Sequence, residues 1–149
     1  MDAEISQSLC KLGAIAALSF AAVGSALGTG AAGAAAIGAW KKCYAQDKTA
    51  PFLLLTFIGA PLSQTIYGMI LMFIMNANTD KPWPVMLGGG VLAGIAIGFS
   101  AWLQGKAGAA GSDALAETGE GFTNYLAALG VIETVAIFVM VFVMIVLLT

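Results

Sequence analysis

The sequence contains no histidine and no arginine, and only 9% of its 149 residues are charged. Without histidine, neither a Ser-His-Asp triad nor a Cys-His pair can form, and histidine-rich metal sites are excluded with them. A soluble domain carries about a quarter charged residues, so this chain lacks the polar residues that would cover a core in water. Six lysines against eight acids leave no basic face for phosphates. Nucleic-acid binding is therefore excluded as a main role.

What the chain has instead is apolar sequence, which makes up 60% of it and gives a mean hydropathy of +0.93. Lipid accepts only backbones that satisfy their own hydrogen bonds, and a spanning helix needs roughly 20 residues. The fold class predicted is an all-α membrane protein with four transmembrane helices, short loops and both termini on one side. The expected spans are Leu12 to Trp40, Phe52 to Met75, Pro84 to Leu115 and Tyr125 to Leu148.

The orientation follows from the lysines, three of which lie in the first expected connection, 41–48. The positive-inside rule assigns such a loop to the cytoplasm. The first and third connections are then cytoplasmic, and the termini lie outside. The acidic start of the chain, Met1 to Glu4, lacks the basic region of a signal peptide and is expected to be retained.

The two cysteines are expected to be free thiols. Cys10 would lie near the outer end of the first helix, and Cys43 is expected in the inner loop. A membrane thickness would then separate them, far beyond the few ångströms that a disulfide allows.

The two halves of the chain resemble each other, which predicts a duplicated helical hairpin over residues 1–77 and 78–149. Residues of the first span recur in the third at an offset of 75, and a weaker echo joins the second and fourth spans at an offset of 71. The first set is Ser25-Ala26, Gly30 and Ala32-Gly33-Ala34-Ala35, matched by Ser100-Ala101, Gly105 and Ala107-Gly108-Ala109-Ala110. The second is Ile66-Tyr67-Gly68-Met69, matched by Ile137-Phe138-Val139-Met140.

Glycine and alanine crowd the first and third spans, whereas the second and fourth carry bulky apolar residues. Small residues let helix backbones approach closely. The first and third helices are therefore expected to form a tight inner circle with their like in neighbouring subunits, and the bulky helices to face lipid. The alternative is ordinary small-residue packing within a single chain.

Glu133 is the candidate functional residue, because it lies about nine residues, or about 13 Å, into the last span. A charge at that depth costs from about 2.5 to more than 10 kcal/mol. It persists there only if it is protonated, paired or bound to a cation. No lysine lies at comparable depth in the second or fourth span. The other interpretation is a protonated glutamate that serves only as a packing hydrogen bond.

Uncharged polar residues are expected at the same depth, and these would be costly unless satisfied. The second span carries Ser63 and Gln64 after Pro61, and the third carries Gln104. One carboxylate, two amide oxygens and a hydroxyl form an oxygen cage suited to a hard cation. Pro61 removes one backbone hydrogen bond and makes carbonyl oxygen available nearby. A proton site would need fewer oxygens, so the two glutamines favour Na⁺ over H⁺; interhelical hydrogen bonding alone is the alternative.

Only the second half carries the carboxylate, because Leu62 occupies the place of Glu133 at the offset of 71. One ion for each four helices follows from this.

Taken together, these features resemble the proteolipid (K/c-type) rotor-ring subunit of V-type (A/V-type) ATPases, over nearly the whole chain. The pattern is close to that of the bacterial sodium-translocating members. The most specific motifs are Pro61-Leu62-Ser63-Gln64-Thr65-Ile66-Tyr67-Gly68, Gln104-Gly105-Lys106 and Val131-Ile132-Glu133-Thr134.

The resemblance implies the roles of individual residues. Na⁺ would be held by Glu133, Gln64, Gln104, the hydroxyl of Ser63 and the carbonyl of Ala60. Tyr67 would hydrogen-bond the glutamate and lock the loaded site. Ser63 stands where the familiar pattern has threonine, so the oxygen is kept but is held less stiffly.

The resemblance also implies partners: identical subunits in a ring in the bacterial cytoplasmic membrane, a stator subunit with an essential arginine, and central-stalk subunits. The chain has no phosphate-binding loop and is expected to perform no ATP chemistry of its own. The same ring carrying H⁺ is the first alternative. A small four-helix cation-coupled transporter and a purely structural four-helix protein are the others, but they leave the duplication or Glu133 unexplained.

Overall fold

The computed structural model describes residues 2–148, and within them all regular structure is helical. Four helical segments are long and apolar enough to cross a membrane, which confirms the predicted fold class. The elements are α1 (Ala3–Ala45), α2 (Leu54–Gly59), η1 (Ala60–Leu62), α3 (Ser63–Ala77), α4 (Trp83–Thr118) and α5 (Phe122–Leu148). The second span, Leu54–Ala77, consists of α2, the 3₁₀ turn η1 and α3 in succession.

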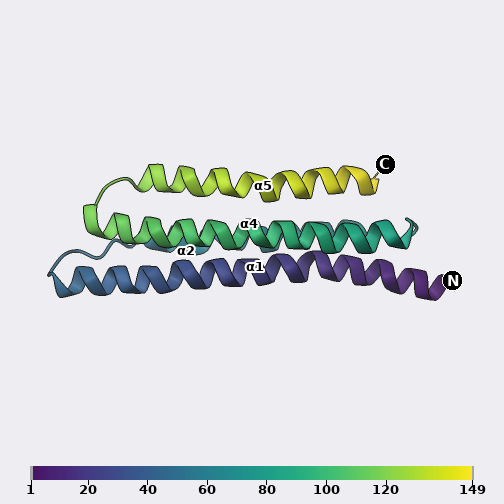
Figure 1. The fold of residues 1–149 in the computed structure, drawn as a ribbon, viewed down its shortest axis with the longest axis horizontal. Helices are drawn as coiled ribbons and strands as arrows, with labels where there is room; N and C mark the ends of the chain where they lie inside the picture. The colour runs from purple at the N-terminus through teal and green to yellow at the C-terminus, as the bar shows by residue number, and fades with distance from the viewer. Residues whose placement is uncertain (1, 149) are drawn as a thin grey trace.

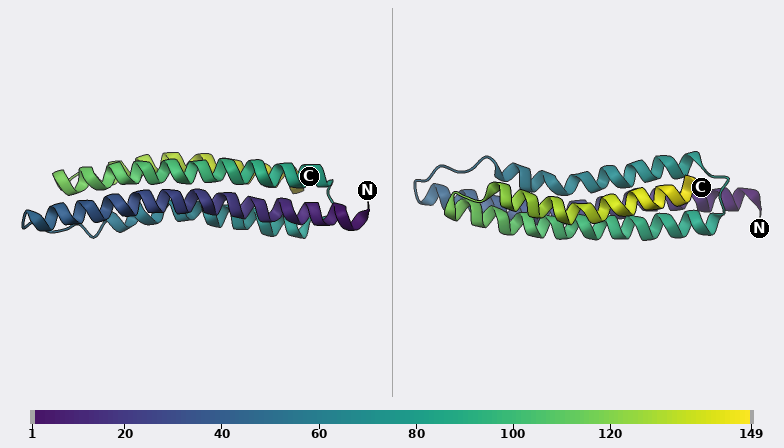
Figure 2. Two further views of the ribbon diagram at one scale, coloured as in Figure 1. Left: turned by 60° about the horizontal axis from the view of Figure 1, so that its bottom comes forward. Right: turned by 90° about the horizontal axis from the view of Figure 1, so that it is seen from above.

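The spans run side by side along one long axis, with the N- and C-termini at the same end (Figure 1). α1 contacts both α3 and α4, and α5 contacts the same two helices. Two further views show the four spans as one elongated bundle (Figure 2). The connections 46–53 and 119–121 lie at the end opposite the termini, as the predicted topology requires.

Three helices, α1, α4 and α5, are longer than the predicted spans, because hydropathy marks the lipid boundary and not the end of a helix. α1 continues through Lys41 and Lys42 to Ala45, and α4 continues through Asp113 to Thr118. Cys43 is therefore not in a loop as predicted; it lies in α1, where it is buried and its thiol donates to the carbonyl of Ala116. Both cysteines are free.

Glycines form the seam between α1 and α4, which is the most extensive interface of the chain. A Cβ added to Gly24 would lie 2.0 Å from the carbonyl oxygen of Gly98, and one added to Gly105 would lie 2.1 Å from that of Gly28. These glycines are used inside one chain, which is the alternative that the sequence left open. Other faces of the two helices stay open, because a Cβ added to Gly30 or Gly88 would meet nothing within 4 Å.

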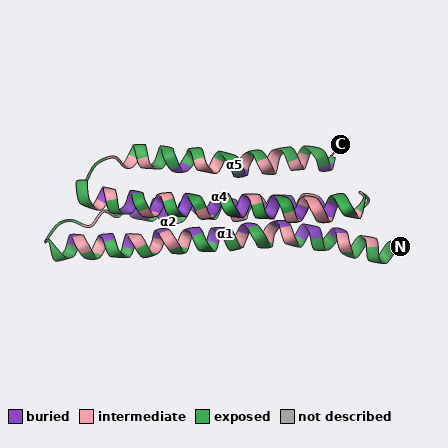
Figure 3. Cartoon of the chain, viewed as in Figure 1, coloured by how far each residue is buried: buried purple, intermediate pink, exposed green. Residues whose placement is uncertain are grey.

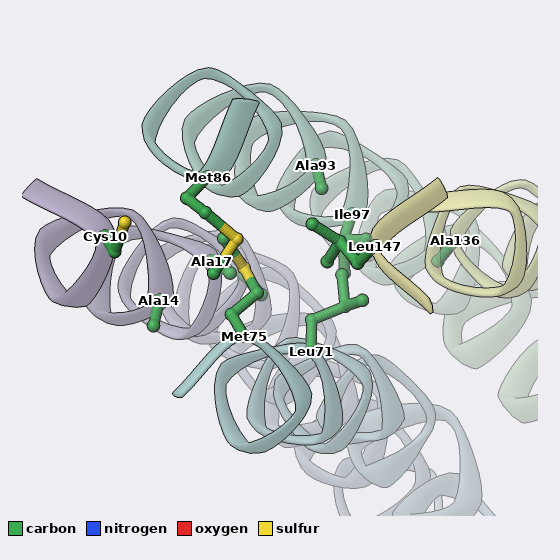
Figure 4. Close-up of a cluster of buried hydrophobic side chains, with 11 residues drawn as sticks. Cys10, Ala14, Ala17, Leu71, Met75, Met86, Ala93, Ile97, Ala136 and Leu147 are labelled. Atoms are coloured by element: carbon green, nitrogen blue, oxygen red, sulfur yellow. The ribbon is translucent and has the colours of Figure 1, made fainter. Parts of the chain in front are cut away.

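Bulky residues fill the space between this seam and the other two spans. At the end that holds the termini, Leu71 and Met75 of α3 meet Met86 and Ile97 of α4, with Leu147 of α5 beside them (Figure 4). A second cluster at the loop end contains Leu54, Phe57, Leu115 and Leu129, and the partly buried aromatic side chains that pack against it are Trp40, Phe122 and Tyr125. The outward face of α5 stays exposed along its length (Figure 3), as expected of a helix that meets lipid.

Candidate ion-binding site

Both oxygens of the Glu133 carboxyl group have a hydrogen-bond donor. The hydroxyl of Tyr67 on α3 donates to Oε1 at 2.6 Å, and Nε2 of Gln104 on α4 donates to Oε2 at 3.2 Å. Glu133 is only partly buried within one chain. Three spans therefore converge on one carboxyl group, and two neutral donors hold its position.

The two glutamine side chains behind Glu133 are fully buried. Nε2 of Gln64 donates to Oε1 of Gln104 at 2.8 Å, and Nε2 of Gln104 also donates to the carbonyl of Leu129 at 3.0 Å. Both N–H bonds of the Gln104 amide are thus occupied on the α5 side. This orientation directs the amide oxygen of Gln104 toward α3.

The break in the second span supplies two more oxygens. Pro61 has no N–H group and so removes one α-helical hydrogen bond at this position, and the chain forms the 3₁₀ turn η1 there. The hydroxyl of Ser63 lies 2.9 Å from the carbonyl oxygen of Ala60 and 3.1 Å from Oε1 of Gln64. A serine hydroxyl has one proton and can donate to only one of these oxygens. The cluster is therefore richer in lone pairs than in protons, which suits a bound cation.

Glu133 has no cationic partner among residues 2–148, where the single ion pair joins Lys42 and Glu117 at 3.4 Å. Lys106 follows Gln104 closely in sequence but lies on an exposed face of α4, with Nζ 4.7 Å from the centre of the Trp102 ring. The same described range contains no group of three or more Cys, Asp or Glu side chains that could hold a metal ion. Any cation at this place would be held by one carboxylate together with neutral oxygens.

The structure thus brings together the residues expected to form the cage and the tyrosine expected to lock it. They are Ala60, Ser63, Gln64, Tyr67, Gln104 and Glu133, contributed by η1, α3, α4 and α5.

Sequence reasoning missed Ser100, whose hydroxyl donates to the carbonyl of Ile132 at 2.9 Å. Together with the bond from Gln104 to Leu129, it fixes the turn of α5 that precedes Glu133. Ser100 lies four residues before Gln104 and so on the same face of α4. That spacing was the available signal.

Residues 87–146 match the family of the ATP synthase C subunit. The matched segment covers most of α4 and α5 and includes Gln104 and Glu133, whereas the residues of the first hairpin lie outside it. No curated protein matches the chain.

Proteins of this family are non-catalytic, ion-carrying subunits that assemble into rings of identical copies. The match covers less than half of the chain, and it makes the second hairpin similar to the proteolipid subunit of the membrane rotor ring of a rotary ATPase. It favours this class over the four-helix transporter and the purely structural protein considered from the sequence.

Proposed function

We propose that this chain is the rotor-ring subunit of a bacterial V-type ATPase, and that it carries Na⁺ at Glu133 during rotation coupled to ATP hydrolysis or synthesis. The observation that carries the proposal is the proton-poor oxygen cluster of Ala60, Ser63 and Gln64, which faces the Glu133–Gln104 pair. A site for a proton alone would need the carboxyl group and one partner. Here the oxygens of Ala60, Ser63, Gln64 and Gln104 form a hydrogen-bonded cluster that reaches the carboxyl group through Gln104.

In this mechanism Na⁺ neutralises Glu133, so the loaded carboxylate can pass through lipid without the cost of a bare charge. The carbonyl of Ala60 and the side chains of Ser63, Gln64 and Gln104 complete its coordination. The short bond from Tyr67 to Oε1 holds the carboxylate against the ion. An arginine of the stator subunit would displace the ion at the point of exchange, and a central stalk would transmit the rotation.

We further propose that the connections 46–53 and 119–121 face the cytoplasm and that the termini lie outside. The lysines near the first connection, Lys41, Lys42 and Lys48, support this orientation. The central stalk would then meet the ring at this end.

Carbodiimide labelling tests the choice of ion, because the reagent modifies a protonated carboxyl group and a bound cation keeps it from doing so. We expect millimolar Na⁺ to protect Glu133 near neutral pH in membranes that contain the ring. K⁺ at the same concentration serves as the control for ionic strength. Labelling that depends on pH alone, with no difference between Na⁺ and K⁺, would assign the ring to H⁺.

The variant Gln104→Ala tests the cage itself. We expect the concentration of Na⁺ that gives half-protection to rise at least about tenfold, since an amide oxygen and a donor to Glu133 are both lost. Ser100→Ala is the matched control, because it removes a hydrogen bond to α5 from the same face of α4 without touching the carboxyl group. Equal protection in Gln104→Ala and the unmodified protein would remove Gln104 from the cage.

A further inference from the structure

Four glycines of α1 and α4 have no close neighbour within the chain, namely Gly30, Gly38, Gly88 and Gly89. A Cβ added to Gly30 on α1 or to Gly88 on α4 would meet nothing within 4 Å. Glycine inside a helix costs about 1 kcal/mol relative to alanine, so an unused glycine calls for another reason. At the offset of 75, Gly30 and Gly88 correspond to Gly105 and Gly13, which are both in close backbone contact at the α1–α4 seam.

Two of these open glycines, Gly30 and Gly88, each lie two residues from a glycine of the seam. Gly30 follows Gly28, and Gly88 precedes Gly90. Two residues correspond to about 200° around an α-helix. Gly30 and Gly88 therefore lie on the faces of α1 and α4 that point away from the seam.

Local structure in the second and fourth spans follows the offset of 71 as well. The hydroxyl of Ser63 donates to the carbonyl of Ala60, three residues earlier, and the hydroxyl of Thr134 donates to that of Val131, also three residues earlier. Because both pairs are 71 residues apart, the correspondence between hairpins extends from the sequence to hydrogen bonding.

We propose that α4 of one chain packs on α1 of a second copy through a repetition of the seam inside the chain. This inference rests on the proposed ring. Exchanging each residue for its counterpart in the other hairpin converts the internal contacts into contacts between copies. The internal contact of Gly28 with Gly105 becomes Leu103 against Gly30 of the second copy. The internal contact of Gly13 with Gly90 becomes Gly88 against Ile15 of the second copy.

The side chains placed opposite the open glycines support this register. Leu103 is 50% exposed and Ile15 is 55% exposed within one chain. Each pair therefore joins a large apolar side chain that has no cover to a glycine that has space for it. A small residue opposite a large one is how closely packed helices interdigitate in a membrane.

The outer layer gives an independent pair by the same exchange. The internal pair of Tyr67 and Glu133 becomes Phe138 against Leu62 of the second copy, and both of these side chains are more than half exposed in one chain. The hydroxyl and the carboxyl group are both absent from this pair. The contact between copies is thus a counterpart of the ion site that lacks its carboxyl group.

Cysteine pairs in membranes test the register, in a background in which Cys10 and Cys43 are replaced by serine. The matched pairs are Gly30→Cys with Leu103→Cys, and Ile15→Cys with Gly88→Cys, each placed on the same chain. On oxidation with iodine we expect a ladder of covalent multimers on a non-reducing denaturing gel, which collapses on reduction.

The crossed pairs use the same four substitutions and provide the control. They are Ile15→Cys with Leu103→Cys, and Gly30→Cys with Gly88→Cys. Their members differ in level along the helices by about 15 residues, or about 22 Å, and a disulfide spans less than about 7 Å between Cα atoms. We expect at least about tenfold less multimer from them than from the matched pairs.

Ladders from the matched pairs and not from the crossed pairs support the proposed register. Ladders of equal strength from the crossed pairs, or none from either matched pair, overturn it. Two matched pairs are used so that poor folding of one variant does not decide the result. Because the ladder does not depend on Na⁺, a ladder without Na⁺ protection of Glu133 would overturn only the ion assignment, and protection without a ladder would overturn only the seam.

Discussion

The variant Glu133→Gln is expected to abolish ATP-driven Na⁺ uptake by vesicles that carry the whole complex. Glutamine has the size of glutamate and keeps an acceptor for the hydroxyl of Tyr67, but it lacks the charge that compensates a cation in lipid. Ring assembly should therefore stay intact, as judged by the oligomer band on a mild detergent gel. The measurement is the uptake of radioactive Na⁺ at saturating ATP.

Glu120→Gln is the matched control for this experiment, because Glu120 is an exposed acid in the connection 119–121 and contacts no residue of the cage. It should leave uptake unchanged. A Glu133→Gln ring that still transports Na⁺ would refute the assignment of Glu133 as the carrier. Loss of the oligomer band together with transport would show that Glu133 is needed for assembly, contrary to the expectation.

The second large effect is expected at the α1–α4 seam, from Gly24→Ala. The added methyl group would lie 2.0 Å from the carbonyl oxygen of Gly98 and 2.3 Å from its Cα. Backbone atoms cannot turn aside as a side chain can, so the two helices must separate along the seam. Overpacking of this kind costs about 1–3 kcal/mol or more. We expect a clear fall in the temperature at which the detergent-solubilised ring loses its helical circular dichroism signal.

Gly38→Ala provides the comparison, since Gly38 is in the same helix but a Cβ there meets nothing within 4 Å. Replacing an exposed helical glycine by alanine favours the helix by up to about 1 kcal/mol. This variant should be as stable as the unmodified protein or slightly more so. If Gly24→Ala and Gly38→Ala lost their helical signal at the same temperature, the close backbone approach at the seam would be wrong.

The sequence predicted the number of spans well, because long apolar segments are a strong local signal. A polar side chain deep in an apolar segment is costly, and so Gln64, Gln104 and Glu133 could be expected to satisfy one another. The hydrogen bonds of the structure connect these residues in the predicted set. Their contact needs only that the spans be antiparallel neighbours.

The helix ends and the partners of the glycines could not be predicted in the same way. A helix can continue after it leaves lipid, so polar residues beyond a span can belong to a helix or to a loop. Hydropathy therefore does not show that the last turns of α1, with Lys41 to Cys43, are helical. Likewise, a glycine-rich span predicts that another helix approaches it closely, but it does not predict which helix. Only the three-dimensional arrangement separates glycines such as Gly24, used within the chain, from Gly30, which is open.

Leu62 stands where the other hairpin has Glu133. This sets how many ions the proposed ring carries in one revolution. A full revolution of the proposed ring would move one cation per chain, although each chain contributes four helices to the circumference of the ring. Fewer ions then share the free energy of each ATP, so each ion can be driven against a steeper gradient. Loss of one carboxyl group in an ancestral duplication would in this way exchange flux for force.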